Sequence, residues 1–490
     1  DSKPDPNSVY FFDAADPATL VNYLDKAFKI ATESQAATST TAPVLPTMGA
    51  GLGTQVYMGK FKPPQDGGPT WPGDLMMFPT REVNGATLIV DSGGNEITDA
   101  LSKDNAQWSA EKILQARGWK NRLIYTRLPA TTLLPNPGLT AVRMNGSTPV
   151  NDPGFQAIKG QLPGSDDAAK LSGWQRFVGW DGANGTRADA MGDIINSTPA
   201  VLAYSTLPSS VSSASGTLSA AWGDGTGKRF SMIFVGDNQG FLHAFGEVAW
   251  DVAVTDANGK SVKITTGVAD ELWAFVPTDL LPHVDYYRTS GNPHRYAVDG
   301  SPTAYLLDRP QGSTEVTGNG KYDVDATNEL ALVIFGLGKG GRSYYALDVR
   351  EPGLPRISEN AGKGWSLCPD EVANYPAGRF LADGDKIKVI KKMGYSTSIP
   401  TPARMLYGAT PAVKDFIFLG AGYSVPEVEA GNPTGLGAGT KLGRGIVAIE
   451  AATGNIARVW DFSSINGMGP IAAGVIPYEF AQGSGLHFRA

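Results

Sequence analysis

From about residue 190 onward, short apolar segments alternate with turn-forming residues along the chain. Three of these segments end in glycine: MIFVG at 232–236, LVIFG at 332–336 and FIFLG at 416–420. Each is followed by a segment that alternates around an alanine, namely FLHAF at 241–245, YYALDV at 344–349 and IVAIEA at 446–451. Because the side chains of a strand point alternately to its two faces, this pattern predicts pairs of β-strands joined by turns.

These strand pairs recur in a constant order. A proline-containing segment precedes each pair, and a strand with tryptophan often closes the unit; the prolines are Pro199, Pro302, Pro402 and, more loosely, Pro470, and the tryptophans are Trp273 and Trp460. Four strands in one order predict a propeller blade, which buries both faces only by stacking on its neighbours. The units recur about every 100 residues, roughly twice the length of a compact blade. Each unit is therefore either two blades or one blade with long loops, such as residues 312–329 and 426–443.

The first part of the chain follows other patterns. Residues 9–12 predict a strand, and residues 16–31 predict a helix that starts with Asp16 as its cap. We interpret residues 1–32 as the remnant of an α/β domain, residues 33–47 as a polar linker and residues 48–490 as the propeller.

Some segments of residues 48–490 predict elements outside the repeat. TQVYMGKF at 54–61 and WPGDLMMF at 71–78 predict a hairpin. Residues 108–118 predict a short helix, and residues 121–128 predict a strand after it. KIKVIKK at 386–392 alternates like a solvated strand.

Composition supports a β protein with many turns. The chain has Gly 60 and Pro 34, and charged residues make up only 18% of it, against about 25% in typical soluble proteins. Glycine and proline interrupt helices and favour turns. The predicted fold class is all-β: a modified β-propeller with a short N-terminal strand–helix remnant.

Charge and cysteine content exclude several classes of protein. The net charge is −7, no basic face for nucleic acid stands out, and no apolar run is long enough to span a membrane. Cys368 is the single cysteine. A disulfide, a zinc–cysteine cluster and a CxxC redox pair within the chain are therefore excluded.

Five motifs in a fixed order resemble the C-terminal domain of PilY-type proteins: MGDIINSTPAVL, VGDNQGFLHAF, ELWAFVPTDLLP, HRYAVDGSPTAYLLD and GLGKGGRSYYALDVREP. WPGDLMMF resembles the entry strand of that family, and YFFDAADPATLVNYLDKAF resembles the end of its von Willebrand A-like domain. The resemblance implies a quinoprotein-type propeller of about seven blades. It also implies a non-enzymatic, extracellular protein of the type IV pilus tip. Such a protein would contact minor pilins and a host or abiotic surface, and would support adhesion, pilus assembly and the balance of extension and retraction.

The family typically carries a late acidic calcium loop of the DxDxDxxxD kind, which this sequence lacks. Calcium is therefore implied by the resemblance without an assigned site, and no cofactor is predicted from the residues themselves. Calcium needs about six to eight oxygen ligands. The weak candidates are Asp323, Asp325 and Asn328 in YDVDATNE, for which a solvated loop is the simpler interpretation.

VGDNQGFLHAF at 235–245 combines an acid, amides and a histidine. His243 alternates with Leu242 and Ala244, so it shares a face with Phe241 and Phe245, which predicts a packed core histidine and not a catalytic base. DNQG predicts the turn between two strands. The counterpart segments GLGKGG and GAGYS keep the glycine before Asp237, which is Gly236, but lose Asp237, Asn238 and His243, so we expect that this shared glycine position serves to turn the chain.

Glycine clusters at 336–342 and 435–445 invite comparison with phosphate loops. Both run into alternating strands and not into helices, so they predict turns, structured by Arg342 and Arg444. The sequence has no GxSxG or HExxH motif, and no catalytic residue is predicted.

Two alternatives to a pilus protein stay open. AIEAATGNIARVW resembles the blade-docking motif of quinoprotein dehydrogenases, which hold pyrroloquinoline quinone and calcium at the propeller axis. The other alternative is a secreted binding propeller unrelated to pili.

Overall fold

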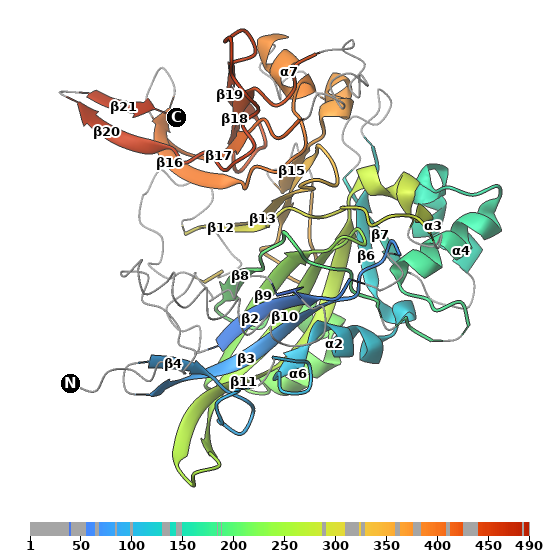
Figure 1. Ribbon diagram of the computed structural model, residues 1–490, viewed down its shortest axis with the longest axis vertical. Helices are drawn as coiled ribbons and strands as arrows, with labels where there is room; N and C mark the ends of the chain where they lie inside the picture. The colour runs from blue at the N-terminus through green and yellow to red at the C-terminus, as the bar shows by residue number, and fades with distance from the viewer. Residues whose placement is uncertain are drawn as a thin grey trace.

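The computed structural model consists mainly of β-strands in several sheets, with few helices (Figure 1). It describes residues 39–40, 55–63, 68–83, 86–98, 101–129, 138–143, 149–183, 185–187, 189–286, 291–308, 323–324, 329–357, 363–375, 384–407, 412–424, 440–482 and 485–489. The predicted α/β remnant at 1–32 lies outside the described residues, as does the predicted linker at 33–47 apart from residues 39–40. The mainly-β fold class agrees with the prediction.

Three antiparallel sets of four strands follow one another along the chain, which we call sheets A, B and C. Sheet A contains β8 (Ala200–Tyr204), β9 (Lys228–Gly236), β10 (Leu242–Thr255) and β11 (Ser261–Val276). Sheet B contains β12 (Thr303–Leu307), β13 (Leu330–Gly336), β14 (Tyr344–Asp348) and β15 (Gly364–Leu367). Sheet C contains β16 (Thr401–Tyr407), β17 (Ala412–Gly420), β18 (Gly445–Glu450) and β19 (Ile456–Asp461). Among the described residues each predicted repeat unit forms one sheet, so the long period comes from long connections and strands.

A fourth sheet precedes sheet A, and we call it the N-terminal sheet. It contains β1 (Ser39–Thr40), β2 (Gln55–Phe61), β3 (Gly73–Val83), β4 (Ala86–Ile89) and β5 (Trp108–Ser109). Strands β2 and β3 pair antiparallel with Val56 opposite Phe78, which confirms the predicted hairpin.

Sheet A is extended at one edge by β6 (Leu123–Arg127), which pairs parallel to β11, and by β7 (Leu139–Arg143). The predicted helix and strand before this edge are confirmed as α2 (Ala110–Arg117) and β6. A pair of strands, β20 (Tyr478–Gln482) and β21 (Gly485–Arg489), follows sheet C. The segment around Pro470 is not itself a strand; the strand begins at Tyr478.

The connections carry short helices that the sequence patterns did not predict. One of them begins after Asp166, whose side chain accepts a hydrogen bond from the Ala169 amide and caps the helix. These additional helices are α3 (Pro153–Ile158), α4 (Asp167–Val178), α5 (Ser209–Ala214), α6 (Gly216–Trp222) and the 3-10 helices η1 (Trp119–Asn121), η2 (Pro149–Asn151), η3 (Lys159–Gln161), η4 (Thr278–His283) and η6 (Pro369–Asn374).

The strand predicted at 386–392 is wrong, because this segment forms helix α7 (Gly384–Lys391). Val389, Ile390 and Met393 are buried, whereas Lys388 is exposed. Buried positions three and four residues apart lie on one face of a helix. The segment is too short for its lysine spacing to distinguish the two-residue period of a strand from the 3.6-residue period of a helix. The helix is favoured because its apolar side chains pack on sheets B and C.

The core lies between consecutive sheets, and β13 shows how one strand serves two of them. Val333 and Phe335 belong to the cluster that sheet A and sheet B share, whereas Leu332 and Ile334 belong to the cluster shared by sheets B and C. Successive side chains point to opposite faces of a strand, so a sheet covered on both sides requires a continuous apolar run. The sheets therefore stack in chain order, as the colours in Figure 1 show.

A buried glutamate joins the N-terminal sheet to sheet A. Glu247 on β10 accepts hydrogen bonds from Gln55 Nε2 at 2.6 Å and from Trp108 Nε1 at 2.7 Å, and a third from the Tyr57 hydroxyl. Burial raises the pKa of Glu247 above its ordinary value, although the three donors and the more distant Arg229 act in the opposite direction. Three hydrogen-bond donors of the N-terminal sheet thus converge on one buried carboxyl group of sheet A.

The glycine that ends the second strand of each sheet is required by close packing and not by turning. A Cβ atom on Gly236 would lie 2.3 Å from Val298 O, one on Gly336 2.5 Å from Ser396 O, and one on Gly420 2.4 Å from Ile471 O. None of the three glycines is among those with a positive φ. The expectation that this position turns the chain is therefore corrected: the segment leading to the next sheet passes directly against it.

Candidate functional site

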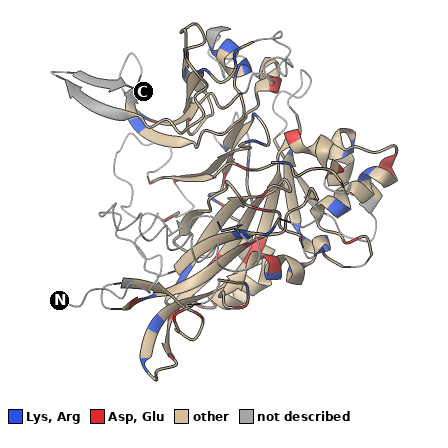
Figure 2. Cartoon of the chain, viewed as in Figure 1, with Lys and Arg blue, Asp and Glu red and all other residues tan. Residues whose placement is uncertain are grey.

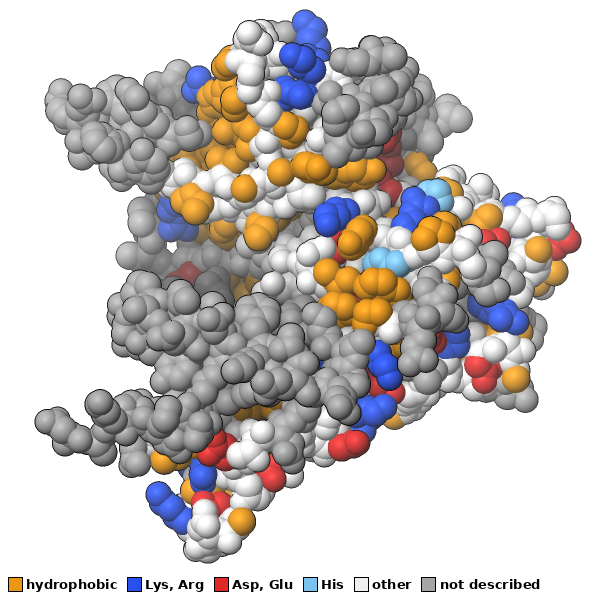
Figure 3. Space-filling model, in the orientation of Figure 1, with side chains coloured by type: hydrophobic (Ala, Val, Ile, Leu, Met, Phe, Trp, Pro, Cys, Tyr) orange, Lys and Arg blue, Asp and Glu red, His pale blue; other side chains and the backbone are white. Residues whose placement is uncertain are grey.

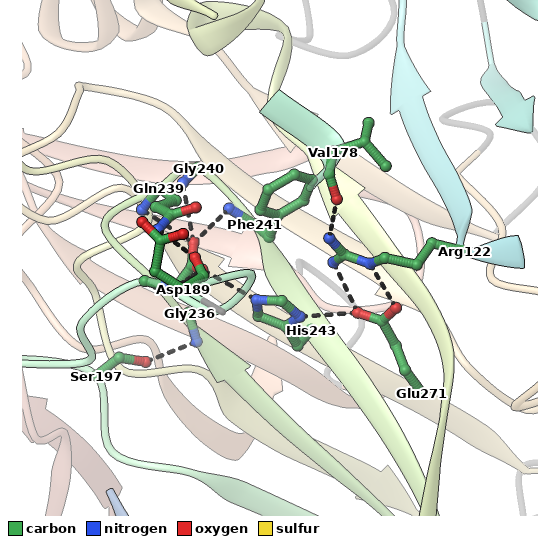
Figure 4. Close-up of polar contacts among 12 residues, drawn as sticks. Arg122, Val178, Asp189, Ser197, Gly236, Gln239, Gly240, Phe241, His243 and Glu271 are labelled. Atoms are coloured by element: carbon green, nitrogen blue, oxygen red, sulfur yellow. Dashed lines mark hydrogen bonds and ion pairs between the residues drawn. The ribbon is translucent and has the colours of Figure 1, made fainter. Parts of the chain in front are cut away.

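The turn between β9 and β10 is organised by one carboxylate. Oδ1 of Asp237 accepts hydrogen bonds from the backbone amides of Gln239, Gly240 and Phe241, at 3.1, 2.9 and 2.8 Å (Figure 4). Gly240 has φ +115, a conformation that favours glycine. The prediction that DNQG is the turn between two strands is confirmed, and Asp237 is the residue that shapes it.

The second oxygen of Asp237 begins a chain of buried charges. Oδ2 lies 3.0 Å from His243 Nε2, and His243 Nδ1 lies 2.8 Å from Glu271 Oε1 on β11. Glu271 in turn forms a two-pronged ion pair with Arg122, at 2.8 and 2.9 Å (Figure 4). The four side chains are each 0% exposed. We call this set, Arg122, Asp237, His243 and Glu271, the buried charge chain.

Each member of the buried charge chain stabilises the charge of its neighbour. Burial alone lowers the pKa of His243, but the Asp237 and Glu271 carboxylates together raise it above its ordinary value. Burial opposes ionisation of Glu271 as well, yet Arg122 and His243 hold its pKa below the ordinary value. A charge removed from water requires such partners, because an unpaired buried ion costs several kcal/mol, on the order of the Born penalty after relaxation.

A histidine held by carboxylates resembles the histidine–carboxylate pair of many active sites, in which the carboxylate orients a catalytic base. Here, however, the histidine is surrounded by side chains of the hydrophobic core. His243 packs between the rings of Phe241 and Phe245, at centroid distances of 5.6 and 5.7 Å. The predicted packed histidine is therefore confirmed, on the face shared with the two phenylalanines. A general base must reach its substrate within hydrogen-bond distance, and a fully buried imidazole held at both nitrogens does not offer that access.

The remaining side chains of the turn bind the segments that lead into sheets A and B. Asn238 donates to Asp193 Oδ1 at 2.6 Å and accepts from the Ala297 amide at 3.0 Å. Gln239 donates to Asp189 O at 2.8 Å and accepts from Arg187 at 2.9 Å. DNQG thus connects parts of the chain that approach the turn from both sides.

A serine contact at the end of the second strand recurs in all three sheets. In sheet A the Gly236 amide donates to Ser197 Oγ at 2.8 Å. In sheet B the Leu337 amide donates to Ser396 Oγ at 2.8 Å, and in sheet C the Gly420 amide donates to Ser398 Oγ at 2.8 Å. Both glycine clusters lead into strands, β14 and β18, as predicted. Arg342 donates to Met393 O at 2.9 Å and Arg444 to Met468 O at 2.9 Å, which confirms that both arginines structure these turns.

The weak metal candidates do not come together in the described part of the chain. Asp323 is described, and its Oδ1 atom is buried without a hydrogen-bond partner; Asp325 and Asn328 lie outside the described residues. No group of three or more His, Cys, Asp or Glu side chains that could hold a metal exists among the residues the structure describes. A carboxylate oxygen without a partner suits a cation, but Asp323 alone falls far short of a calcium ligand set.

Cys368 lies in a second buried polar cluster, between sheet A and η6. Arg127 donates to Cys368 Sγ at 3.2 Å and to Glu371 Oε2 at 2.5 Å. Burial raises the pKa of Cys368 to about 11, although Arg127 acts in the opposite direction. The thiol is therefore protonated at neutral pH and is a poor nucleophile.

The sequence patterns missed the partners of His243. Glu271 and the residue that pairs with it, Arg122, lie in segments that predict only strands. A glutamate inside the otherwise apolar strand ELWAFVP was the available signal, because a charged residue at a buried position requires a partner.

Comparisons with known proteins give related sequences but no family model that matches the chain. The chain is 24% identical over 456 residues to the type IV pilus biogenesis factor PilY1 of Pseudomonas aeruginosa (strain UCBPP-PA14), covering 84% of this chain and 34% of that protein. It is 27% identical over 296 residues to a PilY1 homolog of Xylella fastidiosa, covering 59% of this chain and 18% of that protein. A crystal structure of the Pseudomonas aeruginosa PilY1 C-terminal domain matches 49% of this chain and 31% of that chain, with 22% identity and a TM-score of 0.25.

The chain thus spans about a third or less of the length of these curated relatives. The sequence matches confirm the predicted resemblance to PilY-type proteins. Among the described residues, no helix has the length and apolar character needed to cross a bilayer.

Proposed function

We propose that this chain is the sheet-rich module of a type IV pilus biogenesis factor. The observation that carries the proposal is the match to PilY1 over 84% of the chain. In this proposal the module acts outside the cell at the pilus tip, contacts minor pilins, and contributes to adhesion and to the balance of extension and retraction.

We further propose that sheets A, B and C are blades of a modified β-propeller of about seven blades. The contacts of Gly236, Gly336 and Gly420 support this arrangement, because each sheet meets the segment leading to its successor at the same position. A repeated contact between neighbours is the feature that stacked blades require.

The proposed role is non-enzymatic. The buried charge chain supports this, since its histidine is enclosed between two carboxylates and two phenylalanine rings. The single thiol, Cys368, is buried as well. Function then resides in surfaces, and calcium stays a proposed ligand that rests on the family resemblance.

The proposal is tested by deleting the coding region for these 490 residues from the source organism. We expect surface pili, measured by shearing and immunoblotting of the major pilin, to fall at least about tenfold, with restoration by the complete gene. A deletion strain with normal pili and normal twitching motility would contradict the pilus role. Dye-linked alcohol oxidation by the purified chain after addition of quinone and calcium would instead indicate a dehydrogenase.

A further inference from the structure

Aromatic and cationic side chains from three segments meet outside the buried charge chain. Trp71 precedes β3, residues 286–296 lie between η4 and β12, and Lys339 lies in the turn between β13 and β14. We call the set the aromatic–cation patch; its members are Trp71, Tyr286, His294, Arg295, Tyr296 and Lys339. Lys339 is exposed, and the other five are partly exposed.

Ring contacts make one half of the patch continuous. The ring centroids of Trp71 and His294 are 4.0 Å apart, and those of His294 and Tyr296 are 5.3 Å apart. Lys339 Nζ lies 4.8 Å from the centroid of Tyr296. Tyr286 and Arg295 form the other half, in which the Arg295 guanidinium lies 5.4 Å from the centroid of Tyr286. Arg295 joins the two halves because it lies between His294 and Tyr296 in the sequence.

The two strong cations of the patch contact aromatic rings and no carboxylate. Among the described residues, neither Arg295 nor Lys339 forms an ion pair. The acid next to Lys339 is Asp299, which accepts from the Lys339 backbone amide at 3.5 Å and from Asn196 Nδ2 at 3.0 and 2.9 Å. The acid beside His294 is Asp193, which is buried and also binds Asn238. The local acids are therefore already engaged.

This arrangement stands out in an acidic chain. The net charge is −7, and side chains of both signs are scattered over the elements in view in Figure 2. Near the centre of the face in Figure 3, histidine, Lys or Arg and hydrophobic side chains gather close together. Cations held over aromatic rings are ordered before a ligand arrives, which lowers the entropy lost on binding.

We propose that the aromatic–cation patch binds an acidic polypeptide segment of a partner protein. Carboxylates of the segment pair with Arg295 and Lys339, and its apolar side chains pack on Trp71 and Tyr296. Two cations suit a segment with a few carboxylates. A long polyanion such as DNA needs many phosphate contacts, and the negative charge of the whole chain opposes it. The inference rests on the patch alone and stands whether or not the chain acts in pili.

The test uses the complete 490-residue chain and two fluorescein-labelled peptides. One repeats Glu-Phe-Glu-Gly, and its control carries Gln in place of every Glu. Binding is measured by fluorescence anisotropy at low and high salt. We expect saturable binding of the acidic peptide that weakens with salt, and at least tenfold weaker binding of the control.

Arg295→Gln and Lys339→Gln should each weaken binding of the acidic peptide by about tenfold, as expected for a hydrogen bond to a charged group. The matched control is Lys263→Gln on β11, whose side chain is 73% exposed and pairs with Asp251; it should leave binding unchanged. Circular dichroism verifies that each variant is folded. Equal binding of the two peptides, or unchanged binding by both patch variants, would overturn the proposal. Tighter binding of duplex DNA or of phosphatidylglycerol vesicles through the same two residues would also overturn it.

Discussion

Asp237 is the residue whose replacement most directly tests the buried charge chain. In Asp237→Asn, one oxygen still accepts from the turn amides, but an NH₂ group replaces the other. That group then faces one donor, the Gly192 amide at 2.8 Å, and it replaces the carboxylate oxygen that lies 3.0 Å from His243 Nε2. An unsatisfied buried donor costs about 1–3 kcal/mol, and breaking a buried ion pair costs about 3–5 kcal/mol. We expect Asp237→Asn to lose about 3–5 kcal/mol of unfolding free energy.

The matched control is Asp181→Asn. Asp181 also accepts from two turn amides, those of Ala183 at 2.7 Å and Gly185 at 3.0 Å, but it is exposed. Water can solvate the new amide there, so the loss should stay within about 0.5 kcal/mol. Guanidinium-induced unfolding at pH 7, followed by tryptophan fluorescence, measures both variants. Equal losses for the two variants would refute the assignment of a buried charge chain.

The same variant has a signature in its pH dependence. The pKa of His243 is raised in the folded protein, so this group stabilises the fold fully below its unfolded pKa of about 6.5. That contribution is lost as the pH rises through the folded pKa. Unfolding free energy of the wild type should therefore decline above about pH 6.5, and Asp237→Asn should weaken this decline. Measurements at pH 6, 7, 8 and 9 compare the two slopes.

Three further changes probe other parts of the fold. Glu247→Gln should lose about 1–3 kcal/mol of unfolding free energy at pH 5, because its new NH₂ group faces a buried donor. The loss should be smaller at pH 8, because burial raises the pKa of Glu247 and the wild-type carboxyl group contributes less stability as the pH rises; thermal unfolding at both pH values checks this, and a larger loss at pH 8 than at pH 5 contradicts it. Gly336→Ala should cost at least about 2 kcal/mol, since its Cβ would lie 2.5 Å from Ser396 O, whereas Gly216→Ala meets no atom within 4 Å and should cost little; denaturant midpoints compare them. Cys368 should resist iodoacetamide at pH 8 until the chain is unfolded, as mass spectrometry of labelled protein would reveal, and rapid labelling of folded protein would show that the thiol is accessible.

The repeat units could be predicted because their strands are covered on both faces. Such strands need continuous apolar runs, as in LALVIFG of β13, and these runs are visible in any single sequence. The hairpin of β2 and β3 and the helix α2 were also predicted from local patterns, because apolar residues that recur with the period of a strand or a helix are visible in the sequence. Local patterns were less informative where burial covers only one turn, as α7 shows.

The sequence by itself thus determined the strands, their order and the position of the glycine between them. Only the tertiary structure decided what that glycine is for, because the carbonyl that excludes a side chain at Gly236 comes from Val298 of the next unit. Only the tertiary structure likewise assigned a partner to His243. Arg122 and Glu271 are separated by 149 residues and meet through the parallel pairing of β6 with β11, a long-range contact that no local period encodes. The hydrophobic period and the composition of a segment indicate which of its side chains are buried. The partner of a buried charge, in contrast, depends on how segments that are distant in the sequence pack together.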